Sequence, residues 1–214
     1  MPDSVGPPLP GVKVCLGESN ELLVGGPGVM LGYWKRPDAT REVIDNEGWL
    51  KTGDIAEIVE GKIYIRGRIK DILVTSTGEK IPRADLESAI GLDGLFDQVV
   101  IVGEGKPYLA ALIVLNRGAW ADLAASKGLD PDDPQTLQKP EVRDRAVSRI
   151  NACLGEFPAY AEIKAAYLTL DPWTVDNNMM TSTLKPRRTF IMENYANEIE
   201  ALYEGHGLPP GSSV

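Results

Sequence analysis

The chain of 214 residues carries a formal net charge of −9, and its 43% hydrophobic and 25% charged residues are typical of a globular protein. Nucleic acid is excluded as a partner class, because an acidic surface opposes the phosphate backbone. The longest apolar run, Leu109 to Leu115, falls short of the ~20 residues that span a bilayer, and the amino terminus lacks a signal-peptide pattern. We expect a cytoplasmic protein and leave peripheral association with a membrane open.

The scarcity of cysteine and histidine disfavours several kinds of catalytic site. Cys15 and Cys153 form neither a CxxC motif nor a metal-ligand spacing, so we expect no metal site in these residues. The single histidine, His206, lies in a Gly- and Pro-rich tail, which disfavours Ser-His and Cys-His catalysis. The glycines of 103–107 lack the spacing of a phosphate-binding loop, so we interpret this stretch as a turn between strands.

The first third of the chain predicts short strands joined by turns. The predicted strands are 12–16, 21–24, 55–59 and 63–65. A short helix is predicted from Pro37 to Ile44, and a loop from Gly48 to Asp54. Strands at this spacing favour a small, distorted β-barrel.

Beyond Gly67 the pattern changes to α+β, which places the predicted domain boundary at 67–70. Apolar spacing predicts a helix over 83–90, a second around Trp120 and a third carrying the stripe from Val142 to Leu154. The predicted strands are 98–102, 108–114 and 163–170, the first two paired as a hairpin. A single final helix is predicted to run from Phe190 to Tyr203.

Three segments, in this order, resemble the carboxy-terminal signatures of AMP-forming adenylating enzymes. They are Lys51-Thr52-Gly53-Asp54, Gly67-Arg68-Ile69-Lys70-Asp71 and the stretch from Met180 to Arg188 that contains Lys185. The likeness is closest to bacterial long-chain fatty-acyl-CoA synthetases. It implies the fold shared by acyl-CoA synthetases and firefly luciferase, with 1–66 as an incomplete β-barrel subdomain, 67–71 as a hinge and 72–214 as a mobile α+β lid domain.

The resemblance implies that Asp54 and Arg68 bind the nucleotide. A carboxylate can accept two O–H donors at once, which suits Asp54 to the ribose hydroxyls of ATP. The planar, permanently charged guanidinium of Arg68 suits the ribose and phosphate region. Without this context, Asp54 is better explained as a turn residue and Arg68 as a solvated charge.

The resemblance implies roles for Lys70 and Gly78 in the step that follows adenylation, in which coenzyme A takes up the acyl group. Lys70 holds the position that the family uses as a hinge, about which the carboxy-terminal domain changes its pose. Gly78 lies in Thr75-Ser76-Thr77-Gly78-Glu79, which matches a family loop lining the channel for coenzyme A. Glycine permits close approach of a ligand to the backbone, but Gly78 is equally explained by turn geometry.

Lys185 is the implied catalytic residue. In the family, the lysine at this position lies between the substrate carboxylate and the ATP phosphate, where a positive charge offsets the repulsion between two anions. Taken alone, the cluster from Lys185 to Arg188 reads as a solvated helix start. The broad family favours glycine before the lysine, whereas this chain has Leu184, as the long-chain branch commonly does.

The family's phosphate loop and its magnesium-binding glutamate have no counterpart in these residues. We therefore expect the chain to be part of a longer protein in which Met1 is an artificial start, and to be inactive alone. The implied whole is an ATP-dependent long-chain fatty acid–CoA ligase using fatty acid, ATP, coenzyme A and Mg²⁺, completed by the missing amino-terminal portion. The alternatives are a ligase that loads a carrier protein, or a non-catalytic docking module.

Overall fold

The computed structural model describes residues 4–204, so Met1 and His206 lie outside it. The chain divides into two compact units, of which the first ends at Ile72 and the second begins at Leu73. No helix within the described part has the length and hydropathy of a membrane span.

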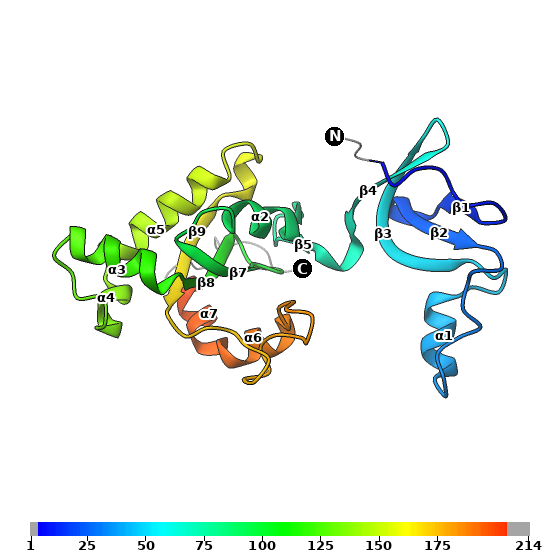
Figure 1. Cartoon of the computed structure of the whole chain (residues 1–214). Helices are drawn as coiled ribbons and strands as arrows, with labels where there is room; N and C mark the ends of the chain where they lie inside the picture. Colours follow the sequence, from blue (N-terminus) through cyan, green and yellow to red (C-terminus); the bar gives the residue numbers. More distant parts are fainter. Residues whose placement is uncertain (1–3, 205–214) are drawn as a thin grey trace, which may run out of the picture. The chain divides into compact units, whose positions relative to one another are not determined.

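The first unit is a curled antiparallel sheet. Its order is β1 (Lys13–Leu16), β2 (Glu21–Gly25), β3 (Leu50–Val59) and β4 (Lys62–Arg68). The segment that leads into β1 also lies along the outer edge of β4, where Val5 N–H donates to the Ile63 carbonyl (2.9 Å) and Ile63 N–H donates to the Gly6 carbonyl (3.0 Å). This segment therefore lies along β4 at one edge of the sheet and continues into β1 at the other edge, which makes the sheet a partial barrel. Figure 1 shows the strong bend of β3.

A small core and two short helices accompany this sheet. Leu22, Ala56 and Ile63 are buried together, with Val14 and Val24 packed against them. The helices are η1 (Glu18–Asn20) and α1 (Pro37–Val43), the latter beginning with a proline, which has no N–H to lose at that position. The prediction of a loop up to Asp54 was wrong, because β3 already begins at Leu50.

The second unit is built on a three-stranded sheet of order β7 (Phe96–Val102), β8 (Leu109–Leu115) and β9 (Ile163–Thr169). The predicted hairpin is confirmed, since β7 and β8 pair antiparallel, while β9 runs parallel to β8. All seven residues of β8 are buried. Helices must therefore cover both faces of the central strand.

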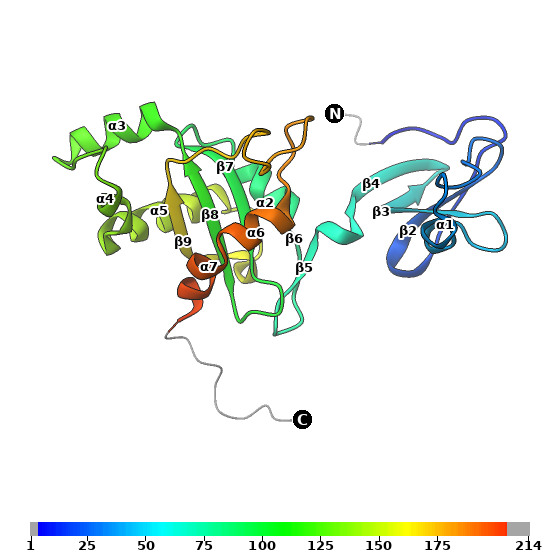
Figure 2. The same ribbon diagram turned by 90° about the horizontal axis from the view of Figure 1, so that it is seen from below.

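Each face of the sheet has its own helices (Figures 1 and 2). One face carries α2 (Arg83–Ile90), α3 (Arg117–Ser126), α4 (Pro134–Gln138) and α5 (Pro140–Cys153), whose apolar side chains form the larger core with Ile101, Ile113 and Leu168. The other face carries α6 (Arg188–Asn194) and α7 (Ala196–Tyr203), which pack with Trp173 on Val100, Leu112 and Val114.

The remaining elements of the described chain are short. They are η2 (Ile69–Asp71), η3 (Ala159–Ala161) and the two-stranded sheet of β5 (Ile72–Val74) and β6 (Lys80–Pro82). The predicted helix over 83–90 is confirmed to the residue, and the stretch 103–107 is the β7–β8 turn as predicted. The single final helix was wrong, because α6 ends at Asn194 and α7 begins at Ala196.

Candidate functional site

A bulge in β3 positions the carboxylate of Asp54. Glu21 pairs with Ile55 and Leu23 pairs with Lys51, so three residues of β3, from Thr52 to Asp54, stand opposite Leu22 alone. Extra residues in one strand re-aim the side chains that they carry. Gly53 has φ +74, a left-handed conformation that glycine adopts without steric cost.

Hydrogen bonds within β3 and to the neighbouring strand β2 fix this bulge. The hydroxyl of Thr52 donates to the Leu22 carbonyl (2.8 Å), and Gly53 N–H donates to a carboxylate oxygen of Glu21 (2.9 Å). The N–H of Asp54 donates in turn to the Thr52 hydroxyl (3.0 Å). The backbone beside Asp54 is thus held in place before any ligand arrives.

Asp54 and Arg68 form an ion pair across neighbouring strands. The two residues are partners in the register of β3 and β4, and Arg68 Nε lies 2.8 Å from Asp54 Oδ1. The side chain of Asp54 is 25% exposed and that of Arg68 is 66% exposed. This leaves a partly shielded carboxylate beside a solvent-facing guanidinium, an arrangement that can accept hydroxyl donors and attract a phosphate from adjacent atoms.

Lys70 is the central residue of η2, a single 3₁₀ turn that connects β4 to β5. This turn immediately precedes the boundary between the two compact units. A short 3₁₀ segment between elements is often a connector or hinge.

Gly78 lies in the tight turn between β5 and β6. Gly78 N–H donates to the Thr75 carbonyl (3.0 Å), and the Thr75 hydroxyl lies 2.8 Å from that of Thr77. Gly78 has φ +85, and a Cβ built there meets nothing within 4 Å. The turn geometry therefore accounts for the glycine, and the open space above it leaves room for a ligand.

Lys185 lies on a narrow loop that folds back on itself before α6. Thr181 N–H donates to the Lys185 carbonyl (2.9 Å), and Lys185 N–H donates to the Thr181 hydroxyl (3.0 Å). Leu184, next to the lysine, has φ 57 and is 70% exposed. A bulky residue at positive φ is uncommon, so the loop holds a strained backbone beside an exposed ammonium group that makes no ion pair with residues 4–204.

An ion pair holds the segment that follows this loop. Arg188, the first residue of α6, donates to both carboxylate oxygens of Glu87 on α2. One of these oxygens also accepts the Ile101 N–H (2.8 Å). This ion pair joins the start of α6, three residues after Lys185, to α2.

The structure places the predicted residues in two groups. Asp54 and Arg68 lie together in the first unit, while Gly78 and Lys185 belong to the second. The sequence did not single out Glu21 as the support of the bulge, or Glu87 as the partner of Arg188. Within the described range no three His, Cys, Asp or Glu side chains cluster as metal ligands.

Comparisons with known proteins agree with the predicted family. The chain is 34% identical over 209 residues to a long-chain-fatty-acid–CoA ligase of Mycobacterium tuberculosis, covering 94% of this chain and 34% of that protein. It is 30% identical over 198 residues to a chloroplastic long-chain-fatty-acid–[acyl-carrier-protein] ligase of Arabidopsis thaliana, covering 87% of this chain and 26% of that protein. The chain thus spans about a quarter to a third of these relatives.

Solved structures support the fold. The adenylation and carrier didomain of a carboxylic acid reductase from Segniliparus rugosus, solved with AMP, has a TM-score of 0.76 and 25% identity over 92% of this chain and 28% of that one. The predicted α+β fold of acyl-CoA synthetases is confirmed. Residues 70–207 match the family model described as the AMP-binding enzyme C-terminal domain, and the chain therefore belongs to the AMP-binding enzyme family.

Proposed function

We propose that the chain is the carboxy-terminal part of an ATP-dependent long-chain fatty acid–CoA ligase. In this reaction the fatty acid carboxylate attacks the α-phosphorus of ATP, so that pyrophosphate leaves and an acyl-adenylate forms. The thiolate of coenzyme A then attacks the acyl carbonyl, and AMP leaves. The relatives that carry this activity by name, at 30–34% identity over most of the chain, support the proposal.

The exposed Lys185 loop is the observation that carries the chemical part of the proposal. The first step brings two anions together, and a fixed positive charge between them lowers its barrier. Lys185 presents such a charge from a loop whose two sides are joined through Thr181 and whose exit is fixed through Arg188. A cation delivered by a pre-formed loop needs little reorganisation when the charge develops.

The ion pair of Asp54 with Arg68 supplies the proposed nucleotide contacts. Asp54 accepts the ribose hydroxyls and Arg68 contacts the ribose and phosphate region. The bulge fixed by Glu21 and Thr52 supports these contacts because it orients the carboxylate in advance. We place magnesium binding in the part of the enzyme outside this chain, and we expect the chain alone to be inactive.

A change of pose at Lys70 is proposed to separate the two half-reactions. Residues 1–66 serve as the distal part of the large domain, 67–71 as the hinge, and 72–214 as the lid. Gly78 then lines the coenzyme A channel. Replacing Lys70 with proline fixes φ and removes an N–H, so in the full-length protein the two half-reactions should fall by unequal factors. Equal losses in both would contradict the hinge.

A carrier protein is the alternative acceptor. One relative at 30% identity is an acyl-carrier-protein ligase, and one structural neighbour is joined to a carrier domain. Supplying the full-length protein with coenzyme A or with a phosphopantetheinylated carrier, and following thioester formation, separates the two acceptors.

The test of the main proposal is Lys185→Ala in the full-length protein. Pyrophosphate release should fall about 10²–10³-fold, while thioester formation from supplied acyl-adenylate should be largely kept. Lys139→Ala, which removes another exposed lysine of the same unit, is the matched control. Unchanged pyrophosphate release in Lys185→Ala would favour a non-catalytic docking module instead.

A further inference from the structure

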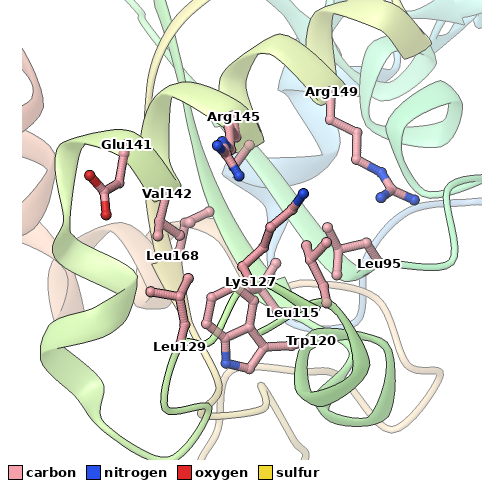
Figure 3. Close-up of a pocket in the computed structure, with 12 residues that line it drawn as sticks. Leu95, Leu115, Trp120, Lys127, Leu129, Glu141, Val142, Arg145, Arg149 and Leu168 are labelled. Atoms are coloured by element: carbon pink, nitrogen blue, oxygen red, sulfur yellow. The ribbon is translucent and has the colours of Figure 1, made fainter. Parts of the chain in front are cut away.

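The second unit contains an apolar pocket of about 560 Å³ on the face of the sheet that α3 and α5 cover. Trp120 and Leu168 contribute to its wall and are almost fully buried. Figure 3 shows the lining side chains converging from α3, α5 and the strands. The apolar lining consists of Leu95, Leu115, Trp120, Leu123, Leu129, Val142, Ala146 and Leu168. Its volume is within the range of small-molecule sites, about 300–1,000 Å³.

Cationic side chains stand at the mouth of this pocket. Lys127 and Arg145 both line it, both are exposed, and neither makes an ion pair with any residue in 4–204. Figure 3 shows the nitrogen atoms of Lys127 and Arg145 on the side of the pocket where Arg149 lies, with the carboxylate of Glu141 set apart from them. Arg149 also lines the pocket, but it is already bound by Asp93. The pocket lining therefore carries two cations without an ion pair in residues 4–204, against the single carboxylate of Glu141, in a chain whose net charge is −9.

The pocket lies on the other side of the sheet from the Lys185 segment. The pocket residues Leu115 and Leu168 belong to the core beneath α2, α3 and α5. Met180, close to Lys185 in the chain, packs with α6 and α7 against Val100 and Leu112 on the opposite face. A ligand in the pocket is thus separated by the strands from the residue proposed to act in adenylation.

We propose that this pocket binds an anionic single-chain amphiphile, with the apolar tail against Trp120 and Leu168 and the head group between Lys127 and Arg145. The apolar lining excludes a ligand that is polar along its length, because buried polar groups without partners are costly. The two cations favour an anionic head over a cationic one. This second site does not depend on the proposed ligase activity.

The test uses the full 214-residue chain and alkyl carboxylates below their micellar concentrations, with binding followed by calorimetry. Dodecanoate should bind saturably, and affinity should rise about fourfold for each methylene from octanoate to dodecanoate. Undecyltrimethylammonium, which has the same eleven-carbon alkyl chain and the opposite charge, should bind at least tenfold more weakly. Equal binding of the two amphiphiles would overturn the assignment of the head-group site.

Variants locate the binding. Combining Lys127→Glu with Arg145→Glu should weaken dodecanoate binding about tenfold or more, and Leu129→Trp should remove it by filling the cavity. Arg143→Glu, which alters a residue of α5 outside this pocket, and Lys185→Ala should both leave it unchanged. Dodecanoate binding that survives Leu129→Trp, or that is lost in Lys185→Ala, would overturn the proposal while leaving the ligase proposal untouched.

Discussion

Glu87 and Arg188 form a paired ionic contact between residues 101 positions apart in the chain. The contact passes the free edge of β7, where the Ile101 N–H has no strand partner and donates to Glu87 instead. Both side chains are largely shielded, with 12% of Glu87 and 24% of Arg188 exposed. The pair therefore covers an open sheet edge and fixes the helix that follows the Lys185 loop.

Replacing Glu87 with glutamine should destabilise the chain by about 2 kcal/mol, because a charged hydrogen-bonding partner of Arg188 is lost while the acceptor for Ile101 is kept. Urea unfolding should show a lower midpoint with an unchanged slope. Glu193→Gln, an exposed change on α6, should stay within about 0.5 kcal/mol. In the full-length protein Glu87→Gln should lower the rate of adenylate formation more than the affinity for ATP. A variant as stable and as active as the parent would contradict this positioning role.

Asp54→Asn should weaken ATP and AMP binding by the full-length protein about ten- to hundredfold, because a neutral amide accepts the ribose hydroxyls less strongly than a carboxylate. The stability of the 214-residue chain should change by less than about 1 kcal/mol, since Arg68, its partner, is 66% exposed. Calorimetric titration with AMP measures the first effect and urea unfolding the second. Asp38→Asn, which breaks the exposed pair with Arg41 on α1, is the control that should leave nucleotide binding intact.

Much of the second unit could be predicted because its elements bury one face with a regular period. The spacing of Leu86 and Ile90 predicted α2, and the apolar run over 108–114 predicted the strand β8. The same reasoning gave a wrong prediction for the end of the described chain, where it indicated a single helix. Phe190 to Tyr203 carries a continuous apolar stripe, yet the chain forms two helices with Tyr195 between them. The spacing of the apolar residues is continuous across Tyr195, so it could not reveal where the first helix ends.

The site could be predicted only in part, because its geometry comes from contacts distant in sequence. The glycine and polar residues before Asp54 indicated a loop, whereas pairing with β2 makes them a bulge held by Glu21, 32 residues away. Glu87 reads as an ordinary polar position of an amphipathic helix, and its partner is remote. Leu184, where the broad family favours glycine, was visible in sequence, and its positive φ explains that preference.

Asp93 and Arg149 should make the stability of the second unit depend on acidic pH. The guanidinium of Arg149 donates to both carboxylate oxygens (2.6 and 2.8 Å) and holds the pKa of Asp93 below its ordinary value of 3.8. Since the folded state binds this proton less readily than the unfolded state, the stabilisation is complete above that value and is lost as the pH falls through the folded pKa. Arg149 is about half exposed, so the contribution is limited to about 1 kcal/mol.

The comparison of the parent with Asp93→Asn measures this dependence. The asparagine keeps the acceptor for the Leu95 N–H, so the two proteins should differ near neutral pH and converge as the pH is lowered past 3.8. Urea midpoints taken along a pH series give the difference. A gap that stayed constant down to the acid end would show that the ion pair is not its source.

Ile113 in β8 should be among the most costly positions to truncate. It is fully buried in the core that α2, α3 and α5 share with the sheet. Ile113→Ala leaves a cavity and should cost about 2–5 kcal/mol, whereas Ile113→Val removes one methylene and should cost about 0.5–1.5 kcal/mol. Val175→Ala, at a site 44% exposed in the same unit, should change stability by less than about 0.5 kcal/mol.

Tryptophan fluorescence during urea unfolding measures these costs. Replacing Trp34 and Trp49 with phenylalanine confines the tryptophan fluorescence to Trp120 and Trp173, which are buried in the second unit, so that urea unfolding reports on this core. Equal costs for the alanine and valine variants would mean that the surrounding side chains collapse into the space, contrary to the close packing expected where both faces of a strand are covered.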